Sequence, residues 1–206
     1  MRPRLFVETN FVNQIVLERD EPDIVRATAQ IVRWAEEQSI ELALPAFSLL
    51  EAEFTFRSGD KRRNRLWEEL RREELELQRS PVTRPAATEL ARFRETYLLI
   101  GKDESARYDA MLESFLRNAV LIPLDAGILS EATKLKESRL NRADAVVFAS
   151  CLKYFETHPS QGERRIFYTQ NKGDFKEPHA ARLQSHDVEL VTDLRGCSAR
   201  ILETTV

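Results

Sequence analysis

The stretch LFVETN, residues 5–10, decides how the rest of the chain is interpreted. Its first residues are apolar and β-prone, which predicts a short buried strand over 5–8. The run stops at a carboxylate, Glu8, and Thr9 and Asn10 follow directly. An acid in this place either caps the helix that follows or joins other acids in a metal site.

Four further apolar segments repeat this pattern and alternate with stretches of helical periodicity. They are predicted strands: IELALP (40–45), VLIPL (120–124), RIFYT (165–169) and VELVT (188–192). The helices expected around them are Asn10 to about Arg19, one that starts at Pro22, 47–56, 126–138 and 143–155. Such alternation favours a parallel sheet covered on both faces, so we expect an α/β fold with three layers, α/β/α.

The composition changes between Arg57 and Asn118, where helix-forming and charged residues dominate. The segment 59–79 is strongly charged, and helical stretches follow over 86–100 and 104–118. Gly and Ser are few here and an apolar face recurs, which indicates a helical insertion at about 57–118 rather than a linker. We therefore expect one domain over 1–206 that carries this insertion.

The totals exclude several classes of protein. Of 206 residues, 42% are hydrophobic and 32% charged, which is typical of a globular chain, and no apolar stretch approaches the ~20 residues of a membrane span. The N-terminal apolar run is too short for a signal peptide, so we expect a cytoplasmic protein without a membrane partner. The two cysteines and three histidines are scattered, which signals neither a zinc site nor a disulfide framework.

Four acids fall where a parallel sheet would gather them. Glu8 ends the first predicted strand, Glu51 lies on the helix after the second, and Asp174 follows the RIFYT strand. Asp144 opens the apolar helix 143–155. Ligands of open parallel sheets bind at the carboxyl ends of the strands, so these side chains can share one crevice.

Each acid also has an ordinary structural reading. Asp144 suits a helix N-cap or first turn, Asp174 a turn, and Glu8 a cap for the next helix. Glu51 suits an exposed helix position, and Glu53 competes with it. If the four do meet, some of them must be protonated unless a cation neutralises them, and an all-oxygen site favours Mg²⁺ or Mn²⁺ with a phosphodiester substrate.

Four motifs together resemble the PIN-domain nucleases, which include the ribonuclease toxins of bacterial toxin–antitoxin pairs. They are Glu8-Thr9-Asn10, Ser48-Leu-Leu-Glu51, Ala143-Asp144-Ala145 and Thr169-Gln-Asn171-Lys-Gly-Asp174-Phe175. They occur in the family's order and span nearly the whole chain. The last two are the more specific.

The resemblance implies a function and a set of roles. Glu8, Glu51, Asp144 and Asp174 would be the catalytic, metal-binding acids of an Mg²⁺- or Mn²⁺-dependent ribonuclease. Supporting polar positions would be Asn10, Ser48, Thr169 and Asn171. An RNA substrate, a protein antitoxin and a homodimer are the partners it implies.

The chain departs from the family in two places. Glu8 stands where the family usually has Asp, and the segment 57–118 exceeds what the compact toxins carry. A binding module that holds RNA or protein without cleaving it is therefore the alternative, and Glu8 is its best support. A phosphatase of the haloacid dehalogenase type would need a D-x-D pair after the first strand, where this chain has E-T-N.

A basic cluster opens the predicted insertion, and acids follow it closely. Phosphates of RNA would bind to it by charge. Many of its members can instead pair with acids one helical turn away, as on a solvated helix. The candidate RNA-binding residues are Arg57, Lys61, Arg62, Arg63 and Arg65.

Overall fold

The computed structural model describes residues 1–17, 22–135, 140–171, 173, 175 and 177–203. The chain forms two compact units. One, here called the sheet unit, is Met1–Ala52 with Met111–Val206; the other, the hairpin unit, is Glu53–Ala110. Within the described ranges, no helix is both long and apolar enough to cross a lipid bilayer.

The five predicted strands are all present and form one parallel sheet, so the expected α/β class is confirmed. The strands are β1 (Arg4–Phe6), β2 (Glu41–Pro45), β3 (Ala119–Ile122), β4 (Arg165–Tyr168) and β5 (Val188–Val191). Their order is β3-β2-β1-β4-β5. The strand β1 is shorter than expected and leaves Glu8 just beyond it.

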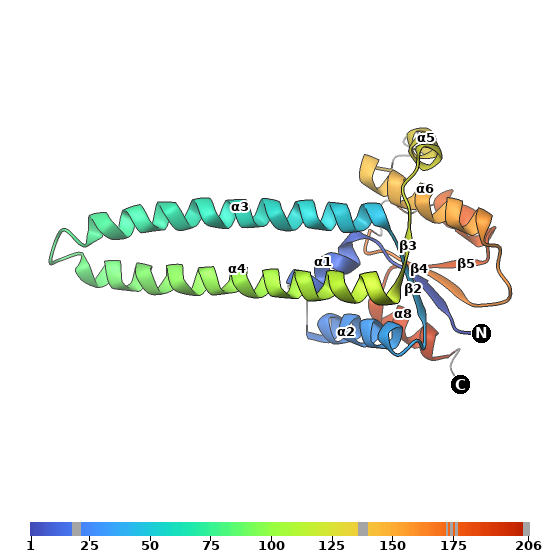
Figure 1. Cartoon of the computed structure of the whole chain (residues 1–206), viewed down its shortest axis with the longest axis horizontal. Helices are drawn as coiled ribbons and strands as arrows, with labels where there is room; N and C mark the ends of the chain where they lie inside the picture. The colour runs from blue at the N-terminus through green and yellow to red at the C-terminus, as the bar shows by residue number, and fades with distance from the viewer. Residues whose placement is uncertain (18–21, 136–139, 172, 174, 176, 204–206) are drawn as a thin grey trace. The chain divides into compact units, whose positions relative to one another are not determined.

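Helices of the sheet unit lie on both faces of the sheet. Figure 1 shows α5 and α6 on one side and α2 and α8 on the other. The bounds are α1 (Thr9–Leu17), α2 (Pro22–Glu36), α5 (Ala126–Leu135), α6 (Arg142–Thr157), α7 (His179–Gln184) and α8 (Leu194–Leu202). The helices α7 and α8 were not predicted. The C-terminal ends expected for α1 and α5 fall in 18–21 and 136–139, which lie outside the described residues.

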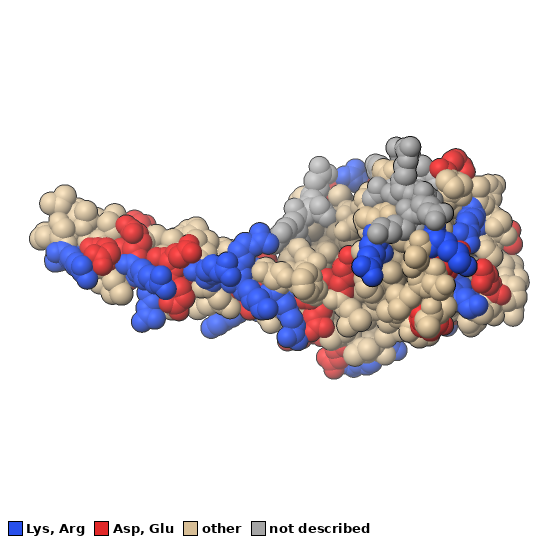
Figure 2. All heavy atoms as spheres, turned by 90° about the horizontal axis from the view of Figure 1, so that it is seen from above, with Lys and Arg blue, Asp and Glu red and all other residues tan. Residues whose placement is uncertain are grey.

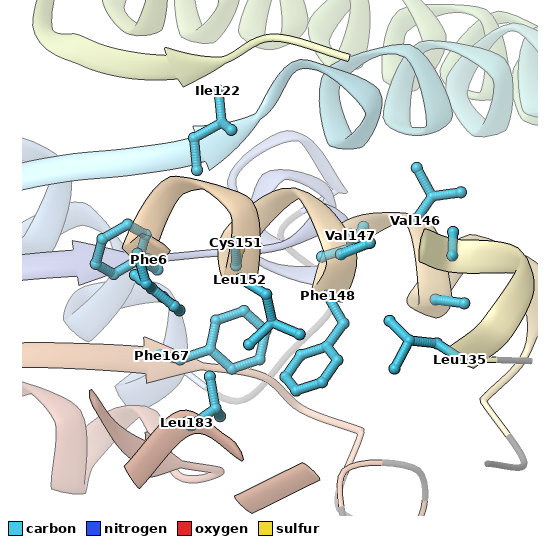
Figure 3. Packing of buried hydrophobic residues seen from close by; sticks show 14 of the residues in the cluster. Phe6, Ile122, Leu135, Val146, Val147, Phe148, Cys151, Leu152, Phe167 and Leu183 are labelled. Carbon is cyan, nitrogen blue, oxygen red and sulfur yellow. The ribbon is translucent and has the colours of Figure 1, made fainter. Parts of the chain in front are cut away.

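The main hydrophobic core packs α6 against the centre of the sheet. Phe6 of β1 and Phe167 of β4 pack with Phe148 and Phe155 of α6, all with no more than 1% of their surface exposed (Figure 3). The alternate strand residues, such as Leu5 and Ile166, are equally buried. A sheet covered on both faces explains why its strands are continuous apolar runs.

Two long helices, α3 (Ala46–Leu77) and α4 (Arg84–Asn118), run from the sheet unit through the hairpin unit. The expected breaks after 56 and between 86–100 and 104–118 are therefore wrong. Strong helix formers flank Gly59 and Gly101, so one glycine at each place does not end the helix. The helical segment expected at 57–118 consists of these two helices.

The hairpin unit has an antiparallel seam in which charged side chains take places that apolar ones usually hold. Phe56 stacks on Tyr108, Arg63 pairs with Glu104, and Glu74 pairs with Arg94. Glu104 is only 5% exposed. The α4 side of the seam repeats every seven residues, at Ala87, Arg94, Gly101, Tyr108 and, beyond the hairpin unit, Phe115. Buried pairs of this kind fix register more than they add stability.

Gly59 offers a test of the continuity of α3. A Cβ added there meets nothing within 4 Å, so Gly59→Ala should raise the free energy of unfolding by about 0.5–1 kcal/mol. The measurement is thermal unfolding followed by circular dichroism at the helical minimum. Gly162→Ala is the matched control: its φ of +97° strains any side chain, so the midpoint should fall. A lower midpoint for Gly59→Ala would contradict an uninterrupted helix.

Candidate functional site

The sheet reverses its strand order at β1, and this point positions the candidate site. From β1 the chain proceeds to β2 and β3 on one side, then returns to β4 and β5 on the other. Crevices in open parallel sheets form at the carboxyl ends of the strands where the order reverses. The register pairs Phe6 with Phe167, so Glu8 and Thr169 leave neighbouring strands side by side.

Glu8 is almost fully buried, at 3% exposed, and its carboxylate is held by hydrogen bonds. Its Oε1 accepts from Thr169 Oγ1 (3.0 Å), Asn10 Nδ2 (3.0 Å) and the Gln170 backbone N–H (3.4 Å). Burial raises the pKa of Glu8 above its ordinary value, and these bonds only partly oppose it. In the described part of the chain, no Lys, Arg or His forms an ion pair with Glu8.

Asp144 lies in the first turn of α6, but it is not the cap of that helix. Asn141 is the N-cap, and its Oδ1 accepts from the Asp144 backbone N–H at 2.9 Å. Of the two structural alternatives predicted for Asp144, the N-cap is therefore wrong and the first-turn position is confirmed. Its Oδ2 accepts instead from the side-chain amides of Asn141 and of Asn171, the latter at 3.0 Å.

One hydrogen-bonded chain joins the two acids. Thr169 Oγ1 donates to Glu8 and accepts from the backbone N–H of Asn171 at 3.0 Å. Asn171 then donates its side-chain amide to Asp144. The turn after β4 thus links the end of β1 to the start of α6, and we call this chain from Glu8 to Asp144 the acid relay.

Glu51 lies beside the acid relay. It occupies the second turn of α3, and its Oε2 accepts from the hydroxyl of Thr9, the neighbour of Glu8. The competing acid, Glu53, pairs with Arg57 on the helix surface. Ser48, one turn before Glu51, is fully buried, and its hydroxyl has no partner among the described residues.

The fourth predicted acid, Asp174, lies outside the described residues. Among the residues that are described, no group of three or more His, Cys, Asp or Glu is spaced to hold one metal ion. The structure thus brings Glu8, Asp144 and Glu51 to one edge of the sheet, linked through Thr169, Asn171 and Thr9.

The chemistry of this donor set fits a hard divalent cation. It offers carboxylate and hydroxyl oxygens, which Mg²⁺ and Mn²⁺ prefer, and no sulfur or imidazole. Two buried groups favour the fit: the Glu8 carboxyl, which has no cationic partner among the described residues, and the Ser48 hydroxyl, which has no hydrogen-bond partner there. If an ion binds at this edge of the sheet, Glu8, Glu51 and Asp144 are the described carboxylates that would hold it.

The basic candidates separate into two kinds. Arg63 lies in the hairpin seam, where it pairs with Glu104 and only 11% of its side chain is exposed, so its role in phosphate binding stays a prediction. Arg57 is exposed and pairs with Glu53. Lys61, Arg62 and Arg65 are exposed on α3. Sequence periodicity does not show which arginine meets a partner on a second helix.

Three residues of the site were not predicted as site residues: Asn141, Thr9 and Gln170. Asn141 carried a signal, because Asn just before an apolar helix is a typical N-cap. Thr9 and Gln170 lie inside the quoted motifs, but their bonds depend on the approach of α3 and β4 to β1.

The raised pKa of Glu8 predicts a pH-dependent stability. A folded-state pKa above the unfolded value means that the stability present below pH 4.5 is lost as pH rises through the folded pKa. Glu8→Gln removes this loss, so in EDTA the amount by which its unfolding midpoint exceeds that of the unmodified protein should grow as pH rises above 4.5. Thermal unfolding in a pH series measures it.

Glu163 provides a control of opposite sign. Burial alone would raise its pKa, but hydrogen bonds from the Gln161 backbone and the Arg165 guanidinium outweigh burial and lower it to about 2. Its contribution is present above pH 4.5 and lost as pH falls toward 2. Glu163→Gln should therefore be destabilised at pH 7, with a deficit that shrinks below pH 4.5. The same trend in Glu8→Gln would contradict the buried, cation-free carboxylate.

Sequence comparison does not place this chain in a known family. No family model matches it, and the search of curated proteins gives no significant match. The resemblance to the PIN-domain nucleases therefore rests on the four sequence motifs. The acid relay and the residues around it are therefore the basis for a proposed function.

Proposed function

We propose that this protein is a divalent-metal-dependent ribonuclease with a PIN-like fold. The observation that carries the proposal is the acid relay at the reversal of strand order, with Glu51 held next to it. Carboxylates that are held at this edge by neutral hydrogen-bond donors repel one another, and a bound cation would remove that repulsion. Asp174 is proposed as the fourth acid.

The protein's own residues would hold the reacting groups in place. Bound Mg²⁺ or Mn²⁺ would activate a water and stabilise charge on the phosphate. Glu8, Glu51, Asp144 and Asp174 would bind the ion, while Thr169, Asn10 and Asn171 keep two of these carboxylates in fixed orientations. Such orientation by neighbouring donors commonly decides metal affinity. This reaction is compatible with a toxin and with an RNA-processing enzyme. Binding of an antitoxin and formation of a homodimer stay predictions.

A second candidate is a module on the same fold that binds RNA without cleaving it. The observation in its favour is that one oxygen of Glu8 already accepts three hydrogen bonds. A carboxylate satisfied in this way has less capacity for a metal. RNA binding without turnover at any metal concentration would support this candidate.

Replacement of Asp144 tests the catalytic proposal. Asp144→Asn keeps the shape of the side chain but removes its charge. We expect single-stranded RNA to be cleaved in the presence of Mn²⁺ or Mg²⁺, and the variant to be slower by about a hundredfold, the effect of ~3 kcal/mol lost from the transition state. Gel analysis of end-labelled RNA gives the rates.

Asp193→Asn is the matched control for this substitution. Asp193 also follows a strand, β5, and it caps α8 through the backbone N–H groups of Arg195 and Gly196. Asn caps helices as well as Asp, so this variant should cleave normally. Equal cleavage by Asp144→Asn and the unmodified protein would remove Asp144 from the mechanism.

Metal binding has a readout that needs no catalysis. An ion that binds only the folded protein raises its stability, by about 2.7 kcal/mol at a hundred times the dissociation constant. Mn²⁺ should therefore raise the unfolding midpoint of the unmodified protein, and less so that of Glu8→Gln and Asp144→Asn. Asp193→Asn should respond fully. A shift of equal size in all four proteins would place the ion elsewhere.

A further inference from the structure

The hairpin unit contains a pocket between α3 and α4 that is separate from the candidate site. Its volume is about 190 Å³, below the roughly 300–1,000 Å³ of pockets for drug-sized ligands, which suits one flat ring system. Trp67 and Tyr97 contribute rings, and Leu98 adds apolar surface. Asp60, Asn64 and Ser105 supply hydrogen-bonding groups.

The two aromatic rings are held in place by their neighbours. The guanidinium of Arg94 lies 4.7 Å from the centre of the Trp67 ring and pairs with Glu74 at 3.0 Å. Tyr97 stacks on Phe93 with ring centres 6.0 Å apart. Aromatic walls that are fixed before binding reduce the entropy cost of stacking a ligand.

One exposed cation lines the pocket, and two more follow lining residues directly in the sequence. Lys102 lines it, and Lys61 and Arg65 lie one helical turn apart on α3, on either side of Asn64 in the chain. Within the described residues, no carboxylate pairs with any of these three cations, unlike Arg57 and Arg63. Figure 2 shows Lys and Arg side chains along this unit, interspersed with acids.

We infer that this pocket binds a nucleobase, with its phosphates on Lys61, Arg65 and Lys102. Aromatic rings for stacking and cations for the backbone are the combination by which proteins hold single-stranded nucleic acid. Asp60, Asn64 and Ser105 provide acceptors and donors for the edge of the base. The inference rests on the proposed ribonuclease function for its class of ligand, and it assigns the hairpin unit to substrate binding.

Fluorescence of Trp67 tests this inference directly. The chain has two tryptophans, so Trp34→Phe leaves Trp67 as the sole reporter. Titrations in EDTA would use the four nucleoside 5′-monophosphates, a ten-nucleotide single-stranded RNA, and ribose 5-phosphate, which has no base. We expect saturable quenching by the nucleotides and the RNA, and none by ribose 5-phosphate. Tighter binding of the RNA identifies a strand as the ligand, and equal binding identifies a free nucleotide.

Two substitutions that fill the pocket, Ser105→Leu and Asn64→Leu, should each weaken binding about tenfold, as expected when one stacked base is lost. Thr88→Leu is the matched control on the exposed surface of α4 and should change nothing. Absence of saturable quenching, or no weakening in either folded filling variant, would overturn the inference. Because EDTA removes metal chemistry, these results are independent of the Asp144→Asn cleavage test.

Discussion

The hydrogen bond from Thr169 to Glu8 joins residues 161 apart in the chain and depends on the pairing of β1 with β4. Between these two strands the chain contains β2, β3 and both long helices. The pairing closes the sheet around Phe6 and Phe167, and it leaves a buried carboxylate at the point where the strand order reverses. Among the described residues only neutral donors hold Glu8 there, and burial without a cationic partner disfavours the charged form of the carboxyl.

The hairpin unit applies a different physical principle. Its seam uses Arg63 with Glu104 and Arg94 with Glu74 in places where two-helix seams usually carry leucine. If one partner of such a pair is removed, the other charge stays buried and unpaired. A shifted register would separate the partners in the same way and so would lower the stability of the hairpin unit. Trp67 and Tyr97 border a pocket between the same two helices.

Much of the sheet unit could be predicted from the sequence, because short apolar runs alternate with helical periodicity. The five strands and the place of Glu8, Glu51 and Asp144 followed from that pattern. The prediction wrongly split each long helix into shorter ones. The seven-residue spacing of the seam was not recognised because charged residues dominate the sequence after Phe56. The role of Arg63 depends on a partner 41 residues away, and the cap at Asn141 was not predicted, because the sequence left Asp144 as either the cap or a first-turn acid. Contacts between distant segments are what local patterns do not contain.

The seven-residue spacing of α4 also governs how the length of this chain can vary. Ala87, Arg94, Gly101 and Tyr108 repeat the same position, and Phe56, Arg63, Leu70 and Leu77 do so along α3. Removal or addition of one such repeat from both helices together leaves every remaining seam residue facing its counterpart. A change of any other size rotates one helix against the other. Relatives of this protein should therefore carry hairpins that are longer or shorter in steps of seven residues per helix.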